Sequence, residues 1–335
     1  MQSYLLEMIE CPACHGRLYW CFSERSRHWI ETAEARCSMC GASYPIQDGI
    51  GLFLTPDLPR NDLWEQVDSG LIQHLRAHPE LERQLVETPL DELTPADQFL
   101  RALVLEAHGQ FEEAQVVEDV ATRNLYTAEY KQCWDKQVDM LVERLSTGDG
   151  PIVDLASGRG YLVKRLIREF DRPVVVTDFS PGVLRRNREW LRTLGLDENV
   201  SLLAFDARRS PFKDGAVKTL TTNLGLPNIE KPGQLLQELR RIVSGVFLSI
   251  AHFFAEDDEV NGVVIKQAGL EALLYRRPAW ARFESVGWEV KELSICLGEA
   301  SPTPPSAVLE GVRIDGLPVA DTTLTWCLWE ANNKE

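Results

Sequence analysis

One segment limits the fold of this chain more than any other. Residues 151–162 have the pattern of a short buried strand that runs into a glycine turn containing Gly158 and Gly160. A helix follows, and after it a second apolar strand ends in Asp178. Strand, glycine turn, helix and strand in this order are typical of βαβ units in parallel sheets. The segment therefore predicts an α/β fold in the second half of the chain.

The same segment predicts a nucleotide-type ligand. Glycines at such a turn let the backbone approach a ligand at the helix N-terminus, and Asp178 can accept hydrogen bonds from both hydroxyls of a ribose. A dinucleotide fingerprint would need a third glycine, and this chain has Val163 there. Asp154 on the first strand would repel a pyrophosphate but can help to hold a cationic ammonium group. The pattern favours a nucleoside cofactor with an amino-acid moiety.

A second pattern, at the front of the chain, predicts a metal site. Four of the eight cysteines form two CxxC pairs, Cys11 with Cys14 and Cys37 with Cys40. The opening residues have neither a basic flank nor a long apolar run, so we expect a cytoplasmic protein. In such a protein we expect the cysteines to form no disulfide framework. In that setting two CxxC pairs indicate a zinc site before they indicate disulfides.

The metal is expected to be structural zinc. Each CxxC places two thiolates on a tight turn, and the alternating apolar residues between the pairs suit a hairpin that brings the turns together. Four thiolates close the tetrahedral site, which leaves no open position for catalysis. His15 and His28 are alternative ligands, although a lone histidine beside such a site is more often a surface residue.

The front segment also resembles a known family. Cys11-Pro12-Ala13-Cys14, the second CxxC and the run Tyr44-Pro45-Ile46-Gln47-Asp48-Gly49-Ile50 resemble the small zinc-ribbon proteins that activate tRNA and release-factor methyltransferases. In that family the ribbon is a partner module. The resemblance implies that here it is fused to its client, and a further protein partner at the ribbon is an alternative.

The glycine turn carries a second resemblance. Its sequence, Asp154-Leu155-Ala156-Ser157-Gly158-Arg159-Gly160, resembles motif I of the class I S-adenosylmethionine-dependent methyltransferases, and later segments agree in order. The resemblance implies a Rossmann-like seven-stranded methyltransferase domain that ends in an antiparallel pair at 288–297 and 322–330. We expect three parts: a zinc ribbon at 1–56, a helical connector at 57–125 and the methyltransferase domain at 126–335.

Several cofactor contacts are implied by this resemblance. Ala156, Ser157, Gly158 and Gly160 would line the methionine moiety of S-adenosylmethionine, with Asp154 near its ammonium group. Asp178 would hold the ribose and Phe179 would flank the adenine. Asp206 and Ala207 would contact the adenine edge, and Asn223 would face the sulfonium and the incoming nucleophile. The chain departs from the family pattern at Ser157 and at 243–245, where Val-Ser-Gly replaces the usual Pro-Gly-Gly.

The middle of the chain is rich in helix-forming residues and is acidic. Pro79, Pro89 and Pro95 fall where helices are expected to begin. Tyr126, Tyr130 and Trp134 lie on a helix just before the glycine turn, and they either pack in the core or form a lid over the cofactor. The acidic residues are expected to form a solvated face, with docking of a basic partner as the alternative.

The methyl acceptor is less well defined. The net charge of −16 argues against tight non-specific binding to nucleic acid, and no apolar run is long enough to span a membrane. The loop that starts at Asn223 resembles that of quinone-biosynthesis and related small-molecule methyltransferases, so a small molecule is favoured. Ribosomal or transfer RNA and a non-catalytic cofactor-binding module remain alternatives. No residue is assigned as catalytic; His252 is one candidate base.

Overall fold

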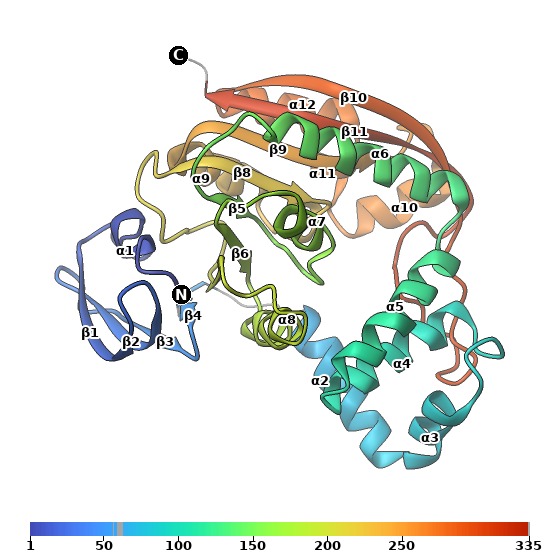
Figure 1. The fold of residues 1–335 in the computed structure, drawn as a ribbon. Coiled ribbons are helices and arrows are strands. Elements are labelled where there is room, and N and C mark those ends of the chain that lie inside the picture. The colour runs from blue at the N-terminus through green and yellow to red at the C-terminus, as the bar shows by residue number, and fades with distance from the viewer. Residues whose placement is uncertain (56, 59–62, 334–335) are drawn as a thin grey trace.

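The computed structural model describes residues 1–55, 57–58 and 63–333. Within them one continuous mixed sheet of 11 strands crosses the molecule in the order β1-β2-β3-β4-β7-β6-β5-β8-β9-β11-β10. The strands are β1 Leu18–Arg25, β2 Ile30–Cys37, β3 Ser43–Gln47, β4 Ile50–Leu52, β5 Ile152–Asp154, β6 Val174–Asp178, β7 Val200–Ala204, β8 Val217–Asn223, β9 Val243–Phe253, β10 Trp288–Ala300 and β11 Thr322–Asn333. Figure 1 shows this sheet running from the blue N-terminal part to the red C-terminal pair.

The last seven strands form the expected Rossmann-like methyltransferase fold. Strands β7, β6, β5, β8 and β9 are parallel neighbours, and β11 inserts antiparallel between β9 and β10. Every residue of β5, β6 and β7 is buried, as expected for parallel strands that helices cover on both faces. Because parallel strands all end on the same side, Asp154, Asp178 and Asn223 lie at one edge of the sheet.

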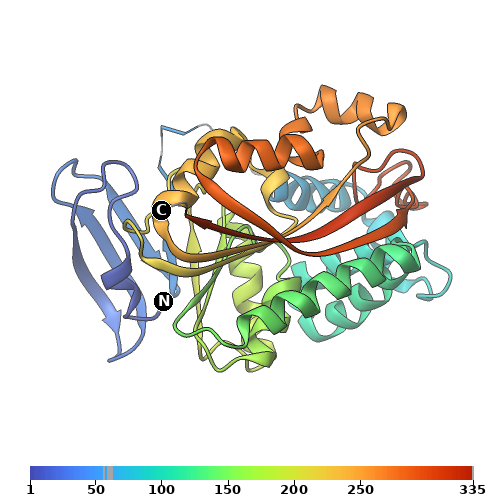
Figure 2. The ribbon, with the colours of Figure 1, turned by 90° about the horizontal axis from the view of Figure 1, so that it is seen from above.

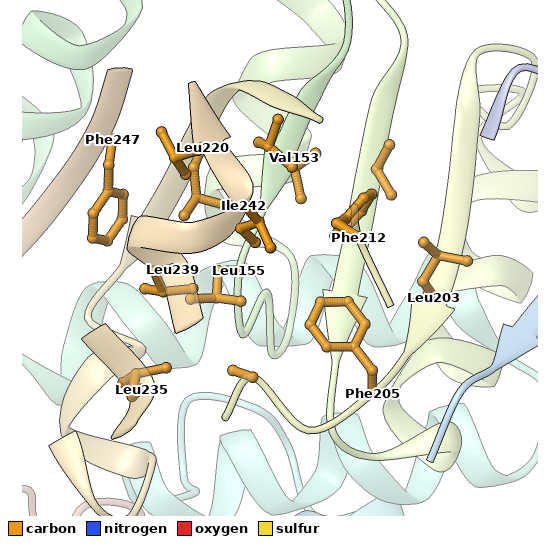
Figure 3. Close-up of a cluster of buried hydrophobic side chains, with 14 of the residues drawn as sticks. Val153, Leu155, Leu203, Phe205, Phe212, Leu220, Leu235, Leu239, Ile242 and Phe247 are labelled. Atoms are coloured by element: carbon orange, nitrogen blue, oxygen red, sulfur yellow. The ribbon is translucent and has the colours of Figure 1, made fainter. Parts of the chain in front are cut away.

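The helices form a layer on each face of the sheet. Seen from above in Figure 2, α6 and α8 lie on one side of the strands, and α9 and α12 lie on the other. The bounds are α6 Ala128–Leu145, α7 Tyr161–Glu169, α8 Pro181–Thr193, α9 Pro232–Ile242, α10 Glu259–Gln267, α11 Glu271–Leu274 and α12 Arg276–Ser285, with a 3-10 turn at Leu226–Asn228. Figure 3 shows the core on the α9 side, where Leu235, Leu239 and Ile242 pack toward Leu155 and Leu220.

The helical connector consists of four helices beside the carboxyl ends of the strands. They are α2 Leu63–Ala77, α3 Pro79–Glu87, α4 Pro95–Ala107 and α5 Phe111–Leu125. Pro79 and Pro95 begin helices as expected, whereas Pro89 lies in the turn between α3 and α4. The small core of the connector also takes in Val308 and Leu309 from the long segment between β10 and β11. Among the described residues, no helix combines the length and the apolar character that a bilayer crossing requires.

The N-terminal ribbon is joined to the methyltransferase sheet by backbone pairing. Strand β4 lies parallel to β7, with Ile50 opposite Leu202 and Leu52 opposite Ala204. The two parts also share one hydrophobic core, because Phe53 belongs to the same buried cluster as Phe205 and Phe212. The ribbon therefore docks on its own chain, at the outer edge of the parallel strands (Figure 1).

A glycine at the start of β9 allows two backbones to approach. A Cβ on Gly245 would lie 2.2 Å from the carbonyl oxygen of Lys218 in β8, at a register irregularity between the two strands. This is the one glycine left from the Pro-Gly-Gly of the family pattern, and the close approach accounts for its presence.

We expect Gly245→Ala to lower the free energy of unfolding by about 1–3 kcal/mol, because the added methyl group must displace backbone. Denaturant unfolding followed by circular dichroism measures this. Gly70→Ala is the matched control: Gly70 lies in α2 with nothing near its missing Cβ, so its replacement should leave stability unchanged or raise it by up to ~1 kcal/mol. Equal stabilities of the two variants would contradict the argument.

Candidate functional site

The four predicted metal ligands converge in the ribbon. The Sγ atoms of Cys11, Cys14, Cys37 and Cys40 all lie within 4.8 Å of one another, with 3.6 Å from Cys11 to Cys40 and 3.4 Å from Cys14 to Cys37. In a tetrahedral site with Zn–S distances of ~2.3 Å, the sulfur atoms are separated by distances close to these. The donor set and its spacing fit structural zinc.

Backbone groups around the cluster support the same conclusion. The N–H groups of Met39 and Cys40 point at Cys37 Sγ, at 3.4 and 3.5 Å. Gly16 leaves space for the cluster, because a Cβ there would lie 2.9 Å from the same sulfur. His15, an alternative ligand, instead bonds Glu10 through Nδ1 at 2.8 Å.

The predicted cofactor turn joins β5 to α7 in an unusual backbone conformation. Ala156, Gly158 and Gly160 have φ angles of 51°, 50° and 75°. Nothing lies within 4 Å of a Cβ built on Gly158, so the turn is open at this point. The Ser157 hydroxyl donates to the Asp154 carbonyl at 3.0 Å and accepts from the Thr177 N–H at 3.3 Å. Ser157 thus ties the turn to both neighbouring strands, which gives this departure from the family pattern a structural role.

Asp178 lies opposite the turn, at the end of β6. Its Oδ2 accepts the Gly158 N–H at 3.0 Å, and its Oδ1 accepts the Ser180 N–H at 3.0 Å. Phe179 follows it and is half-buried. The structure brings these two residues to the same edge as the turn, which is where a bound nucleoside would need them.

Asp154 is buried beneath the turn. Its Oδ1 accepts a hydrogen bond from the Thr221 hydroxyl at 2.7 Å, and the residue as a whole is 1% exposed. Burial raises the pKa of this carboxyl to about 6, because nearby hydroxyl groups only partly compensate for the loss of water. A cation bound above the turn would favour the ionised form.

The predicted adenine-edge residues follow β7. The Asp206 carboxylate is held by the guanidinium of Arg208, with Nε at 2.9 Å from Oδ1 and Nη2 at 2.7 Å from Oδ2. Ala207 is buried beside it. Asp206 is therefore oriented by Arg208, which no sequence pattern marked as part of the site, and its contact with adenine stays a prediction.

Asn223, at the end of β8, is held by the helix that precedes the turn. Its Oδ1 accepts the indole N–H of Trp134 at 3.0 Å. Trp134 also meets the ring of Tyr161 edge-on at 5.5 Å, and Tyr130 stacks on Tyr126 at 4.6 Å. These aromatic residues pack on one another, as the core interpretation expected, and a role of this helix as a lid over the cofactor stays a prediction.

His252 lies deeper than a solvent-exposed base would. Its ring contacts Tyr130, Phe254 and Trp326 at 5.0–6.2 Å, and burial lowers its pKa to about 4. Its Nδ1 has no hydrogen-bond partner among the described residues. The neutral ring belongs to the aromatic cluster around Trp134, next to the edge that carries Asn223.

The contacts between the connector and the turn were not predicted from the sequence. Arg159, between the two glycines, is buried and binds Glu118 and Glu106 of the connector. These acidic residues had been expected on a solvated face. No local pattern pairs them with Arg159, because Glu118 lies 41 residues and Glu106 lies 53 residues away in sequence.

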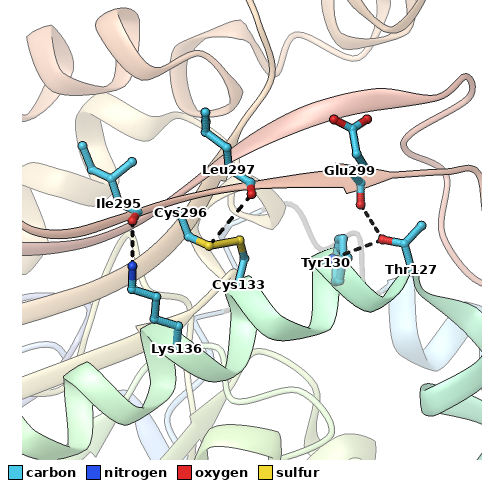
Figure 4. Close-up of a disulfide and its surroundings, with 8 residues drawn as sticks. All are labelled: Thr127, Tyr130, Cys133, Lys136, Ile295, Cys296, Leu297 and Glu299. Carbon is cyan, nitrogen blue, oxygen red and sulfur yellow. Dashed lines mark hydrogen bonds between the residues drawn. A yellow bond between two sulfur atoms is a disulfide. The ribbon is translucent and has the colours of Figure 1, made fainter.

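One disulfide corrects the expectation for the cysteines. Cys133 of α6 is bonded to Cys296 of β10, 163 residues away. Figure 4 shows the bond between the helix and the strand, flanked by a hydrogen bond from Lys136 to the Ile295 carbonyl. Two single cysteines so far apart give no sequence signal of pairing, and the fold alone brings them together.

For the metal, we expect purified protein to contain one zinc ion per chain, and Cys40→Ser to lose it. Cys40 is exposed, so its replacement removes a ligand with little loss of packing. Cys21→Ser is the matched control, since Cys21 is an exposed ribbon cysteine outside the cluster. Elemental analysis and amide exchange measure the outcome. Equal zinc contents in the two variants would contradict the assignment.

Comparison with known proteins agrees with this geometry. Residues 152–245 match the family model described as "Methyltransferase domain", and residues 2–49 match that of "Trm112p-like protein". The ubiquinone/menaquinone biosynthesis C-methyltransferase UbiE of Coxiella burnetii (strain RSA 331 / Henzerling II) is 30% identical over 125 residues, 36% of this chain and 49% of that protein. The protein of the same name from Escherichia coli O1:K1 / APEC is 32% identical over 95 residues, 28% of this chain and 38% of that protein. This chain thus spans about half, or less, of the length of these relatives.

Two solved structures are similar in part. The YcgJ protein of Bacillus subtilis has a TM-score of 0.48 and 14% identity, and the match covers 60% of this chain and 99% of that one. Geranyl diphosphate C-methyltransferase of Streptomyces coelicolor A3(2) has a TM-score of 0.44 and 16% identity, with 60% of this chain and 78% of that one covered. The two family matches by themselves place a segment similar to methyltransferase domains at residues 152–245, behind a Trm112p-like segment that carries the cysteine cluster.

Proposed function

We propose that this protein transfers a methyl group from S-adenosylmethionine to a small-molecule acceptor. The observation that carries the proposal is the turn between β5 and α7, where three residues with positive φ leave the backbone open beside Asp178. A pyrophosphate is disfavoured there, because Asp154 is buried directly beneath the turn. A ligand with a cationic amino-acid end and a ribose suits both carboxylates.

Each predicted residue has a proposed task in holding this cofactor. Ala156, Ser157, Gly158 and Gly160 provide the backbone surface for the methionine moiety. Asp154 favours the ammonium group, and Asp178 and Phe179 serve the ribose and the adenine. Asp206 and Ala207 face the adenine edge, and Asn223 lies toward the reacting centre. The bound cofactor supplies the methyl group, so the protein's main tasks are to align the acceptor and exclude water.

Two features support a small acceptor. The curated relatives are named as C-methyltransferases of quinone biosynthesis. In addition, Arg159 and Arg186, the arginines beside the turn, are paired with connector glutamates, so they present no free basic surface to an RNA backbone. The side chain that contacts Asn223 is the aromatic Trp134, which suits a small apolar acceptor better than a phosphate backbone.

The ribbon is proposed to act within the chain. Its strand β4 already occupies the edge of β7, so the pairing that joins ribbon to sheet needs no second protein. A cytoplasmic location is part of the proposal. Disulfides are rare in reducing compartments, so a cytoplasmic chain would carry Cys133 and Cys296 as neighbouring thiols.

Calorimetric titration with S-adenosylhomocysteine tests the cofactor assignment, with NADH as the control ligand. We expect micromolar binding of the first ligand and none of the second. Asp178→Ala should weaken binding by about 1–3 kcal/mol, because hydrogen bonds to a charged group are lost. Asp171→Ala, an exposed carboxylate in the loop before β6, should leave the affinity within twofold. No binding by the native protein, or equal affinities of the two variants, would refute the assignment.

The raised pKa of Asp154 predicts a pH dependence of binding. In the ligand-free protein this carboxyl takes up a proton as the pH falls through about 6. A cationic ligand prefers the ionised form, so affinity should rise with pH up to about 6 and then level off, falling about tenfold per pH unit below it. Titrations between pH 5 and 7.5 measure this. Asp154→Asn should abolish the slope and Asp178→Ala should keep it; a flat native profile would contradict the role.

A further inference from the structure

A buried cluster of charged residues links the helical connector to the cofactor turn. Its members are Glu106 of α4, Glu118 of α5, Arg159 of the turn, Tyr161 and Lys164 of α7, and Arg186 of α8. We call it the Arg159 cluster. The side chains of Arg159 and Glu118 are 6% and 1% exposed, so they meet each other and not solvent.

Arg159 is placed where its orientation controls the turn. It lies between Gly158 and Gly160, whose left-handed conformations shape the turn. Its Nε donates to Glu118, and its Nη2 donates to Glu106 Oε1 at 2.9 Å. Both ends of the guanidinium are therefore fixed by connector residues, and the planar group cannot rotate without breaking a charged hydrogen bond.

The backbone of the turn is held by the same cluster and its neighbour. Arg186 binds Glu106 through Nε at 2.8 Å and Nη2 at 2.7 Å. The adjacent Asn187 donates to the Gly158 carbonyl at 2.9 Å and accepts from Arg186 Nη1 at 3.0 Å. A chain of hydrogen bonds thus runs from Glu106 through Arg186 and Asn187 to the main chain of the turn.

The two glutamates stay ionised across the physiological range. Burial alone would raise the pKa of Glu118, but the charges of Arg159, Arg186 and Lys164 outweigh it and hold the pKa at about 2. The pKa of Glu106 is lowered in the same way by Arg159 and Arg186, against its burial. The cluster therefore does not switch with pH under ordinary conditions; it is a permanent tie.

The connector has other attachments, so the cluster is not needed merely to dock it. Asp97 of α4 accepts the Ser306 hydroxyl and the Ala307 N–H, the latter at 3.0 Å. Leu100 and Leu103 pack with Val308 and Leu309 of the same segment. These contacts hold the connector to the segment between β10 and β11 and do not involve the turn.

We propose that Glu106 and Glu118 are positioning residues for the cofactor turn, and that the connector thereby sets the affinity of the site for S-adenosylmethionine. The inference rests on the proposed function. In this proposal the acidic connector acts on the cofactor site through the turn, and neither glutamate needs to touch the cofactor. Because coupling between two sites is reciprocal, cofactor binding should in turn protect α4 and α5 from amide exchange.

The test compares Glu118→Gln with Asp97→Asn in the full-length protein. Both replace a buried connector carboxylate by an amide of nearly equal size, but only the first contacts the turn. We expect Glu118→Gln to raise the Kd for S-adenosylhomocysteine at least tenfold, and Asp97→Asn to leave it within twofold. Thermal unfolding of both variants separates a loss of stability from a loss of affinity.

Amide exchange provides the second readout. In the ligand-free protein, Glu118→Gln should speed exchange at residues 156–162, and Asp97→Asn should not. In the native protein, S-adenosylhomocysteine should slow exchange in α4 and α5. Arg159→Lys keeps the charge and loses the planar fork, so this variant replaces Glu118→Gln in the test if Glu118→Gln does not fold. We expect it to show the same increases in Kd and in the exchange rate at residues 156–162.

The outcomes separate the two proposals. Unchanged affinity and unchanged exchange at 156–162 in Glu118→Gln, or in Arg159→Lys where that variant is used, would overturn the positioning role. Equal loss of affinity in Asp97→Asn would overturn it as well, because docking of the connector in general would then be sufficient. If the native protein binds no S-adenosylhomocysteine, the proposed function fails, and exchange at 156–162 in the variants still decides whether the cluster orders the turn.

Discussion

The parallel pairing of β5 with β6 and β8 is the constraint on which the site depends. Parallel strands end on one side of a sheet, so pairing alone brings Asp154, Asp178 and Asn223 to the same edge. Because helices cover both faces of the sheet, a ligand can reach backbone groups at this edge and in the loops that follow it. The turn, the aromatic cluster and the connector are all arranged around this edge.

Much of the fold could be predicted because its signals are local. The glycine turn, the strand ending in Asp178 and the paired CxxC motifs each lie within a few tens of residues, and their geometry follows from short-range rules. The terminal pair β10 and β11 was expected at 288–297 and 322–330, and the structure extends both strands by three residues. The boundaries at 56 and 125 stay predictions.

The remaining features depend on contacts that no short pattern records. Cys133 and Cys296 are ordinary single cysteines until α6 packs on β10. Glu118 is one of many acidic residues in the connector until the fold places it against Arg159. Asp206 was expected to be available to adenine, but the orientation of its carboxylate by Arg208 depends on the local loop. In each case the residue type was visible in the sequence and its partner was not.

The pairing of β4 with β7 has a consequence for how the protein behaves on dilution. Two separate chains that share such an edge associate according to their concentrations, whereas tethered partners meet at an effective concentration set by the linking chain. Here the ribbon and the methyltransferase sheet belong to one polypeptide. The extent of ribbon docking is therefore independent of how much protein is present, and the stoichiometry of ribbon to methyltransferase domain is always one to one.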